Sequence, residues 1–142
     1  MNRYVIDASV AIKWFVPRAE EDNLEQAMAI LDLLSQGKIV CYQPSHFITE
    51  VIAVLSRLCP EKASDDLIDL LNMDFHTVES TKIYVTACEL SIQLNHHTFD
   101  TLYHAVALKT LDTTLITADE AYYRKAKNLD AIMLLQDFIE FE

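Results

Sequence analysis

The chain has 142 residues, of which 51% are hydrophobic and 23% charged, which excludes a disordered chain and fits a single domain over residues 1–142 with a sizeable core. Its apolar runs fall far short of the roughly 20 residues that span a membrane, and Asp7 interrupts the first run before an export signal can form, so we expect a cytoplasmic protein. The formal net charge of −11 argues against tight, sequence-blind binding of nucleic acid by the chain alone.

The cysteine content argues against a disulfide framework. The three cysteines, Cys41, Cys59 and Cys88, are odd in number and form no close pair in the sequence. Paired or clustered cysteines are the usual sign of disulfides or of a zinc site. We therefore expect reduced and mostly buried thiols.

The first third of the chain predicts two strands and two helices. The apolar, β-favouring run 4–6 reads as a buried strand, and 8–15 is expected to turn helical. Apolar residues then recur at helical spacing from Leu24, in a helix that should end at Gly37, because glycine readily adopts the left-handed conformation that terminates helices. Residues 39–42 predict a second strand.

The middle of the chain is dominated by helical patterns. A helix is expected over 45–58, opened by Pro44-Ser45 and closed by Pro60. Ser64, followed by two aspartates, predicts the next helix start. Residues 75–78 predict a short strand, and Ser80 is expected to cap a further helix.

The last third repeats the alternation. Thr98 is expected to cap a helix running to about Leu111, followed by a strand at 114–116, a helix over 119–127 and a last strand at 132–135. With one glycine and three prolines in the chain, connections should be short. Strands that alternate with helices predict an α/β fold with a central parallel sheet covered on both faces.

Four acids are expected to converge at one edge of this sheet. Asp7 follows the first strand directly, and Asp119 follows the 114–116 strand within a few residues; ligands of such sheets bind outside the carboxyl ends of the strands. Glu50, in the middle of its helix, and Asp100, in the first turn of another, border apolar stripes. Taken singly, Asp7, Asp100 and Asp119 could merely cap helices, and Glu50 could reach solvent.

Clustered carboxylates predict a divalent cation. They repel one another, so a metal-free cluster is destabilised, and sets of oxygen ligands favour Mg²⁺ or Mn²⁺ over zinc. Such an ion can activate water and stabilise an in-line attack on a phosphodiester. The four acids therefore indicate metal-dependent phosphodiester chemistry.

Four segments in order resemble the motifs of PIN domains. YVIDASVAIKWF resembles the family's opening motif, and PSHFITEVIAVL, TFDTLYHAVAL and LITADEAYYRKA resemble the second, third and fourth. They span 7–126, and the length is similar to that of a lone PIN domain of the bacterial VapC toxin type. Each motif alone is weak, whereas four in order with suitable spacing are fairly specific.

The resemblance implies a fold, an activity and partners. It implies a three-layer α/β/α sandwich, an Mg²⁺- or Mn²⁺-dependent endoribonuclease that leaves a 5′-phosphate, a homodimer, and an antitoxin protein that blocks the site. By the same resemblance, Asp7, Asp100 and Asp119 ligate the metal, Glu50 ligates it or orients the attacking water, and Ser9 and Thr117 are supporting hydroxyls. We expect the toxin of a toxin–antitoxin pair, acting on RNA.

Rival functions stay open at this point. The acidic charge would suit a non-catalytic, PIN-like protein-binding module, and the same four acids would suit a metal-dependent DNA nuclease or phosphatase. The basic cluster Arg124, Lys125 and Lys127 is either a solvated helix end or a rim that contacts phosphate. The absence of a G-x-S-x-G elbow and of a glycine-rich phosphate loop argues against serine hydrolases and nucleotide-binding folds.

Histidines and aromatic residues have alternative roles. His46 lies four residues before Glu50 and His104 four after Asp100, spacings that would place each pair on one helix face and suit a transition metal. His96-His97 is expected to be a loop. Trp14 and Phe15 could stack on a base. We expect them instead to pack in a core or a dimer interface.

Overall fold

A sheet of five parallel strands forms the centre of the structure, a computed structural model that describes residues 1–16 and 22–139. Its strands lie in the order β3–β2–β1–β4–β5, and every pairing is parallel. The strands are β1 (Asn2–Ile6), β2 (Ile39–Gln43), β3 (Phe75–Thr77), β4 (Thr113–Thr117) and β5 (Ile132–Leu134). The parallel sheet predicted from the alternation of elements is thereby confirmed.

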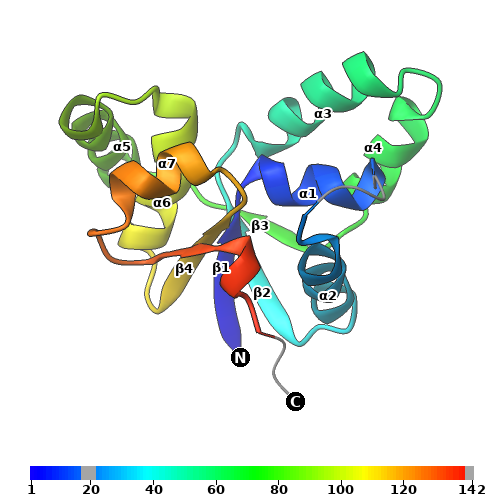
Figure 1. The fold of residues 1–142 in the computed structure, drawn as a ribbon, viewed down its shortest axis with the longest axis horizontal. Helices are drawn as coiled ribbons and strands as arrows, with labels where there is room; N and C mark the ends of the chain where they lie inside the picture. Colours follow the sequence, from blue (N-terminus) through cyan, green and yellow to red (C-terminus); the bar gives the residue numbers. More distant parts are fainter. Residues whose placement is uncertain (17–21, 140–142) are drawn as a thin grey trace.

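Helices cover both faces of the sheet, giving three layers. Figure 1 shows α1 to α4 on one side of the strands and α5, α6 and α7 on the other. The helices are α1 (Ala8–Phe15), α2 (Leu24–Ser35), α3 (Phe47–Leu58), α4 (Ala63–Leu71), α5 (Thr81–Leu94), α6 (Thr98–Lys109) and α7 (Glu120–Ala126). This α/β/α arrangement is the expected one.

The strand order places a crevice beside β1 and β4. The chain leaves β1 toward β2 and leaves β4 toward β5, at opposite sides of the sheet. Because such crossovers are right-handed, the connecting helices leave these neighbouring strands on opposite faces. A gap therefore opens beyond the carboxyl ends of β1 and β4, where open α/β sheets bind their ligands.

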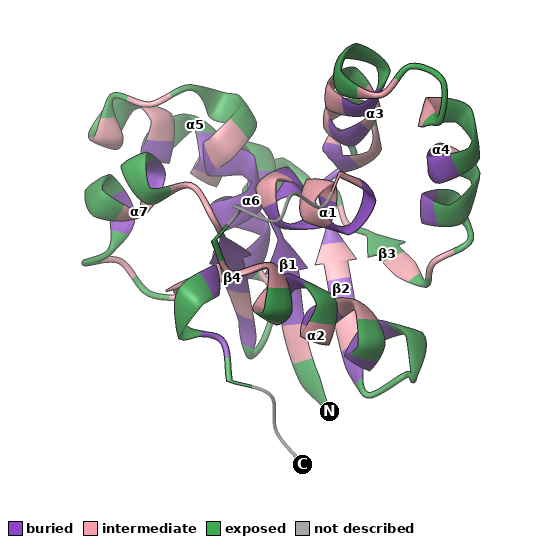
Figure 2. Ribbon diagram, turned by 45° about the vertical axis from the view of Figure 1, so that its right-hand side comes forward, coloured by how far each residue is buried: buried purple, intermediate pink, exposed green. Residues whose placement is uncertain are grey.

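The core lies along the two central strands and α6. Figure 2 shows the buried residues concentrated on β1, β4 and α6. Val5 and Ile6 of β1, Ile116 of β4 and Tyr103 of α6 are fully buried. The sheet therefore rests on a continuous apolar centre, and the polar residues just past the ends of β1 and β4 have a rigid base.

The end of α2 follows the motif expected from its glycine. Gly37 has a φ of +69°, its N–H donates to the carbonyl of Leu34 at 3.1 Å, and the N–H of Lys38 donates to that of Leu33 at 2.9 Å. These two bonds satisfy carbonyls that the helix leaves without partners, as in the Schellman motif. The prediction that the helix ends at Gly37 is confirmed.

Gly37→Ala is expected to destabilise the fold by about 1 kcal/mol, because a β-carbon disfavours the left-handed conformation. A β-carbon at this position would meet no atom within 4 Å, so the cost is purely conformational. Urea denaturation measures it. The control is Gln36→Ala, at the preceding right-handed residue, which should change stability by less than about 0.5 kcal/mol. Equal stabilities of Gly37→Ala and wild type would contradict this account.

Helix starts are predicted correctly at one of three capping sites. The Ser80 hydroxyl accepts from the N–H of Ile83 at 3.2 Å, as expected. Ser64 and Thr98 are not caps. α4 begins at Ala63, with Lys62 at the cap position, and α6 begins at Thr98 itself, with His97 at the cap position. Neither cap residue makes a side-chain hydrogen bond to its helix. α6 ends at Lys109 rather than near Leu111.

Two other expectations are wrong. The last strand ends at Leu134, because residues Leu135–Asp137 form a 3₁₀ turn. Only Cys41 of the three cysteines is buried, while Cys59 is half-buried and Cys88 exposed, although all three are free thiols as expected. Cys41 lies in β2, whereas Cys59 follows the end of α3 and Cys88 lies on α5, where burial depends on how the helix packs. Among the described helices, none has the length and apolarity needed to cross a bilayer.

Candidate functional site

Asp7 lies where β1 ends and α1 begins. Its backbone N–H donates to the carbonyl of Ile116 in β4 at 3.0 Å, and its side chain caps α1 by accepting from the N–H of Ser9 at 3.2 Å. The residue is buried. Asp7 is thus a helix cap, as its simpler interpretation held, but also a carboxylate buried at the carboxyl edge of the sheet.

A chain of hydroxyl groups joins the ends of β1 and β4. The hydroxyl of Ser9 donates to Asp7 Oδ2 and accepts from the N–H of Ala118 at 3.1 Å. The hydroxyl of Thr117 donates to the same Asp7 oxygen at 3.4 Å and accepts from the N–H of Asp119 at 3.0 Å. The two predicted supporting hydroxyls therefore both contact Asp7, and both are directed at one of its oxygens.

Asp119 follows β4 and caps α7. Its Oδ1 accepts from the N–H of Tyr122 at 3.0 Å, while its own N–H is bound to Thr117. The expected position at the sheet edge is confirmed. Its carboxylate is committed to the helix by one oxygen, which leaves Oδ2 as the atom that could bind a ligand.

Glu50 reaches the same region from α3. This helix begins at Phe47, so Glu50 lies in its first turn, not in the middle of a helix as the sequence suggested. Its side chain is 30% exposed, and Oε1 lies 2.7 Å from Nε2 of His46. The same His46 nitrogen lies 2.7 Å from the carbonyl oxygen of Phe99 in α6. The expected pairing of His46 with Glu50 is confirmed, and His46 connects α3 to α6.

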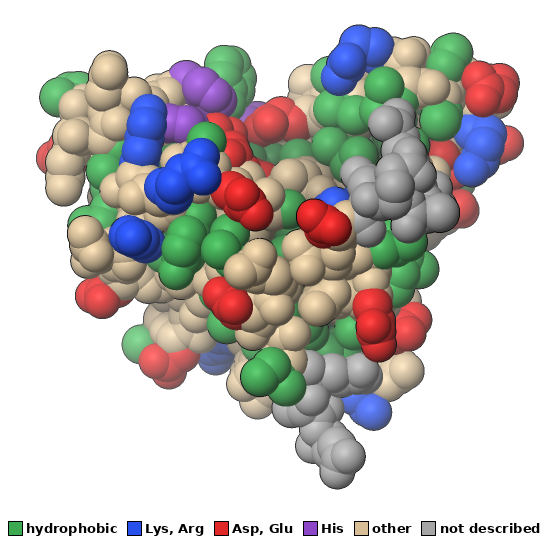
Figure 3. Space-filling view, viewed as in Figure 1, with side chains coloured by type: hydrophobic (Ala, Val, Ile, Leu, Met, Phe, Trp, Pro, Cys, Tyr) green, Lys and Arg blue, Asp and Glu red, His purple; other side chains and the backbone are tan. Residues whose placement is uncertain are grey.

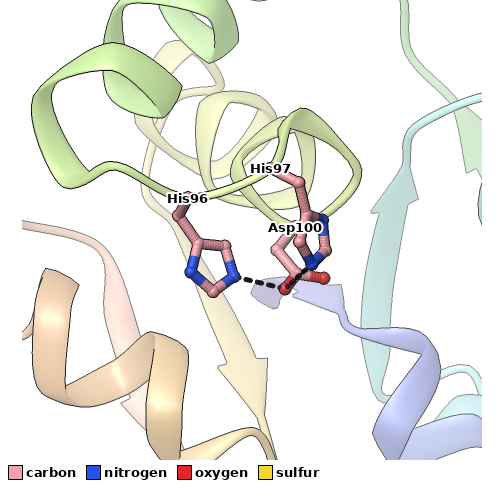
Figure 4. A group of neighbouring side chains, drawn as sticks. All are labelled: His96, His97 and Asp100. Atoms are coloured by element: carbon pink, nitrogen blue, oxygen red, sulfur yellow. Dashed lines mark hydrogen bonds and ion pairs between the residues drawn. The ribbon is translucent and has the colours of Figure 1, made fainter.

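Asp100 lies in the first turn of α6 and meets two histidines. Its Oδ2 is 2.6 Å from Nε2 of His96 and 3.3 Å from Nε2 of His97, and its side chain is 17% exposed. Figure 4 shows both imidazole rings directed toward this one oxygen. The predicted loop at residues 96–97 is confirmed, but its histidines belong to the site.

The charges of three of the acids interact. Burial raises the pKa of Asp7 to about 6 against the lowering effect of the hydrogen bond from Ser9, and the negative charges of Asp100 and Glu50 raise it further. Burial, followed by the charges of the same three acids, also raises the pKa of Tyr103. Asp7 at the end of β1, Glu50 on α3 and Asp100 on α6 therefore all lie near enough to Tyr103 for their charges to act on its hydroxyl.

The face above the sheet is hollowed between these elements. Figure 3 shows a notch with acidic side chains in it, and histidine and basic side chains along one rim. The four carboxylates are not packed at the spacing of ligands on one ion. Among the described residues, the trio whose donor atoms all lie within 4.8 Å of one another is His96, His97 and Asp100.

The donor atoms fit a hard divalent cation. The buried Tyr103 hydroxyl has no hydrogen-bond partner within the described residues, and the buried Glu50 Oε1 has only its contact of 2.7 Å with His46 Nε2. Buried oxygen atoms without partners are costly unless a cation or water meets them. The carboxylates of Asp7, Asp100 and Asp119 each use one oxygen for hydrogen bonds to the protein. Their second oxygens give an oxygen-only donor set of the kind that Mg²⁺ and Mn²⁺ prefer.

One of the two alternative histidine pairings is not formed, and two site residues were not predicted. His104 does not pair with Asp100: it is buried, 2.9 Å from the hydroxyl of Tyr122 and 2.8 Å from the carbonyl of Asp130. His96 was assigned only to a loop, although it precedes Asp100 by four residues, the spacing used for His46 and Glu50. Tyr103 shares a helical face with Asp100, and that spacing is the signal by which it could have been found.

The aromatic pair after the first motif belongs to the core. Trp14 and Phe15 are buried, and the indole N–H of Trp14 donates to the carbonyl of Ala27 at 2.8 Å. Stacking of these rings on a base is therefore excluded in this conformation. The core interpretation is confirmed.

Comparison with known proteins places the chain in a family. The model of the PIN domain matches residues 4–128, while the search of curated protein sequences returns no match. Similar solved structures include a toxin–antitoxin complex from Klebsiella pneumoniae (TM-score 0.67, 13% identity, 93% of this chain and 97% of that one). Two others are VapBC-1 from nontypeable Haemophilus influenzae (0.67, 15%, 95% and 99%) and DNA-bound VapBC from Salmonella typhimurium (0.62, 12%, 94% and 97%). These structures share the fold, and because the family model covers most of its length, the chain belongs to the PIN-domain family.

Proposed function

We propose that the chain is a divalent-metal-dependent endoribonuclease of the VapC type, the toxin of a toxin–antitoxin pair. The observation that carries the proposal is the electrostatic interaction of three acids from separate elements: burial raises the pKa of Asp7 to about 6, and the negative charges of Asp100 and Glu50 contribute to the rise. Evolutionary membership of the PIN family and the likeness to VapBC structures support the nuclease and toxin parts.

Some residues of the site would bind the cation, and others orient the carboxylates that bind it. Asp7, Asp100 and Asp119 would bind Mg²⁺ or Mn²⁺ through the oxygens that make no hydrogen bond to the protein. Ser9 and Thr117 fix the orientation of the Asp7 carboxylate by binding its other oxygen. When bound, such an ion activates water and stabilises the charge of an in-line attack on a phosphodiester.

Glu50 is suited to orienting the attacking water. Its side chain is 30% exposed, against 17% for Asp100, while Asp7 is buried. Glu50 is therefore the acid of these three that water reaches most easily. His46 Nε2 contacts Glu50 Oε1 and the carbonyl of Phe99, and thereby holds the carboxylate in place. The carboxylate can therefore accept a proton from water without leaving its place.

The partners follow from charge and surface. An RNA backbone is repelled by a chain of net charge −11, so we propose weak intrinsic RNA affinity that depends on the local positive charge of a bound metal. Large apolar side chains are exposed on α4 and α5: Ile68, Leu71, Tyr84, Val85 and Ile92. Such surfaces suit protein contacts, and we propose an antitoxin and a second copy of the chain as partners in the cytoplasm.

The test is cleavage of RNA with and without metal. Purified protein with millimolar Mn²⁺ or Mg²⁺ should cleave RNA to fragments with 5′-phosphate ends, and EDTA should stop the reaction. Single-stranded DNA and small phosphoesters, assayed in parallel, should be poor substrates.

Metal binding should also be visible without substrate. An ion that binds only the folded state raises the free energy of unfolding, by about 2.7 kcal/mol at a concentration 100 times its Kd. We therefore expect Mn²⁺ to raise the melting temperature. A melting temperature that does not respond to millimolar Mn²⁺, together with intact RNA, would favour a non-catalytic binding module.

A further inference from the structure

We propose that His96 is a positioning residue for Asp100: Lys125 holds Nδ1 of the ring, Nε2–H donates to Asp100 Oδ2, and Oδ1 is left as the oxygen that would bind the cation. The inference rests on the proposed cation site. It adds a histidine and a lysine to the four acids of the site, and the lysine belongs to the basic cluster near the end of α7.

The hydrogen-bond partners of His96 determine where its proton lies. Lys125 Nζ lies 3.2 Å from His96 Nδ1, and an ammonium group can only donate. Nδ1 must therefore accept, so in the neutral ring the hydrogen is on Nε2. That nitrogen is 2.6 Å from Asp100 Oδ2, the length of a strong hydrogen bond to a carboxylate.

The surroundings keep this ring in place. The His96 side chain is 11% exposed, its ring packs edge-on against Tyr122 at 5.0 Å, and it stacks on His97 at 4.7 Å. Lys125 Nζ is itself anchored by the carbonyl of Asn95 at 2.9 Å. The donor is thus fixed by contacts with both α7 and the α5–α6 loop, which suits a group that must orient a ligand.

The same contacts argue against direct binding of a metal by His96. Its Nε2 could ligate an ion only after losing its hydrogen to Nδ1, and Nδ1–H would then face the ammonium of Lys125. A metal-bound imidazole normally donates its other N–H to an acceptor, and Lys125 offers none. His97 is a weaker candidate for the positioning role, because it is 63% exposed and 3.3 Å from the same oxygen.

The experiment compares ion binding by the wild type and His96 variants. His96→Phe keeps a flat ring against Tyr122 but removes the donor, whereas His96→Gln can place an amide N–H near the position of Nε2. Affinities for Mn²⁺ and Mg²⁺ are measured by calorimetry without RNA. His96→Phe should weaken both ions by a similar factor of roughly 10–100, the usual effect of losing such a partner. His96→Gln should recover part of this loss, and the exposed His76→Phe should bind like wild type.

The state of the ring is tested directly by ¹⁵N NMR of the metal-free protein at a pH where imidazole is neutral. The expected result is a hydrogen on Nε2 of His96. A hydrogen on Nδ1, or a loss of Mn²⁺ affinity in His96→Phe far larger than the loss of Mg²⁺ affinity, would overturn the proposal and indicate direct ligation, since imidazole discriminates in favour of transition metals.

Asp100→Asn separates this inference from the proposed function. If the wild type binds ions, Asp100→Asn does not, and His96→Phe matches the wild type, then only the positioning role is overturned. If the wild type binds neither ion, the cation site itself fails and the inference fails with it.

Discussion

Asp7→Asn is expected to abolish metal-dependent RNA cleavage and, in the same protein, to raise the melting temperature of the metal-free form near pH 7. The catalytic loss follows from replacing an anionic ligand with a neutral amide at the proposed cation site. The gain in stability follows from burial, because the ionised Asp7 carboxylate is shielded from water and is repelled by the charges of Asp100 and Glu50.

The pH dependence gives the sign of the effect. Folding raises the pKa of Asp7 from 3.8 to about 6, so the folded state favours the protonated form. This contribution to stability is fully present below about pH 4 and is lost as the pH rises through about 6. The difference between 3.8 and about 6 corresponds to a cost on the order of 3 kcal/mol at pH 7. Asp7→Asn removes most of that cost, since an amide carries no charge at any of these pH values.

Thermal melts of wild type and variant from pH 4 to pH 8, without metal, measure this prediction. The advantage of Asp7→Asn should be several degrees near pH 7 and should vanish near pH 4. The exposed Asp69→Asn on α4 is the matched control and should show neither effect. Millimolar Mn²⁺ should reverse the order by stabilising the wild type alone. Full nuclease activity in Asp7→Asn would refute the assignment of the site.

Gln43→Leu is expected to destabilise the fold by roughly 2–6 kcal/mol, because it leaves two buried backbone groups without partners at about 1–3 kcal/mol each. The Gln43 side chain accepts from the N–H of Ile6 and donates to its carbonyl, both at 2.8 Å. The two residues are buried. This amide replaces a rung of the sheet where β1 extends past its last pairing with β2.

Urea denaturation of Gln43→Leu, with an unchanged m value, measures the loss. Gln93→Leu makes the same chemical change at an exposed position of α5 and should alter stability by less than about 0.5 kcal/mol. Because Ile6 directly precedes Asp7, RNA cleavage by the folded fraction of Gln43→Leu should fall as well. A stability equal to that of the wild type would show that the two backbone groups of Ile6 find other partners.

Elements with strong local signals are the ones that sequence predicts well. The strand before Asp7, the helix end at Gly37 and the cap at Ser80 each depend on a few neighbouring residues, and all three are as expected. The start of α3 was misplaced because Pro44 and Ser45 suit a turn as well as a first helical turn. Thr98 likewise suits a cap by residue type, but the chain enters α6 one residue earlier, where His97 takes the extended conformation of a cap.

The candidate site divides in the same way. Asp7 and Asp119 could be placed at the sheet edge because each follows a strand, and Glu50 could be paired with His46 because residues four apart share a helix face. Asp100 could be expected near them because it borders the apolar stripe of a helix that must pack on the sheet, and the resemblance to PIN domains supports the same position. His96 and Tyr103 escaped prediction, since their roles depend on where α5, α6 and α7 meet.

By itself, the sequence determined the alternation of strands and helices, the parallel sheet and the elements that carry the four acids, because periodicity and strand ends are properties of adjacent residues. Tertiary structure alone decided the contacts between segments that are distant in the sequence. The Gln43 amide contacts Ile6 across 37 residues and the Thr117 hydroxyl contacts Asp7 across 110. Such contacts depend on the register of neighbouring strands, which is fixed only when the whole core packs.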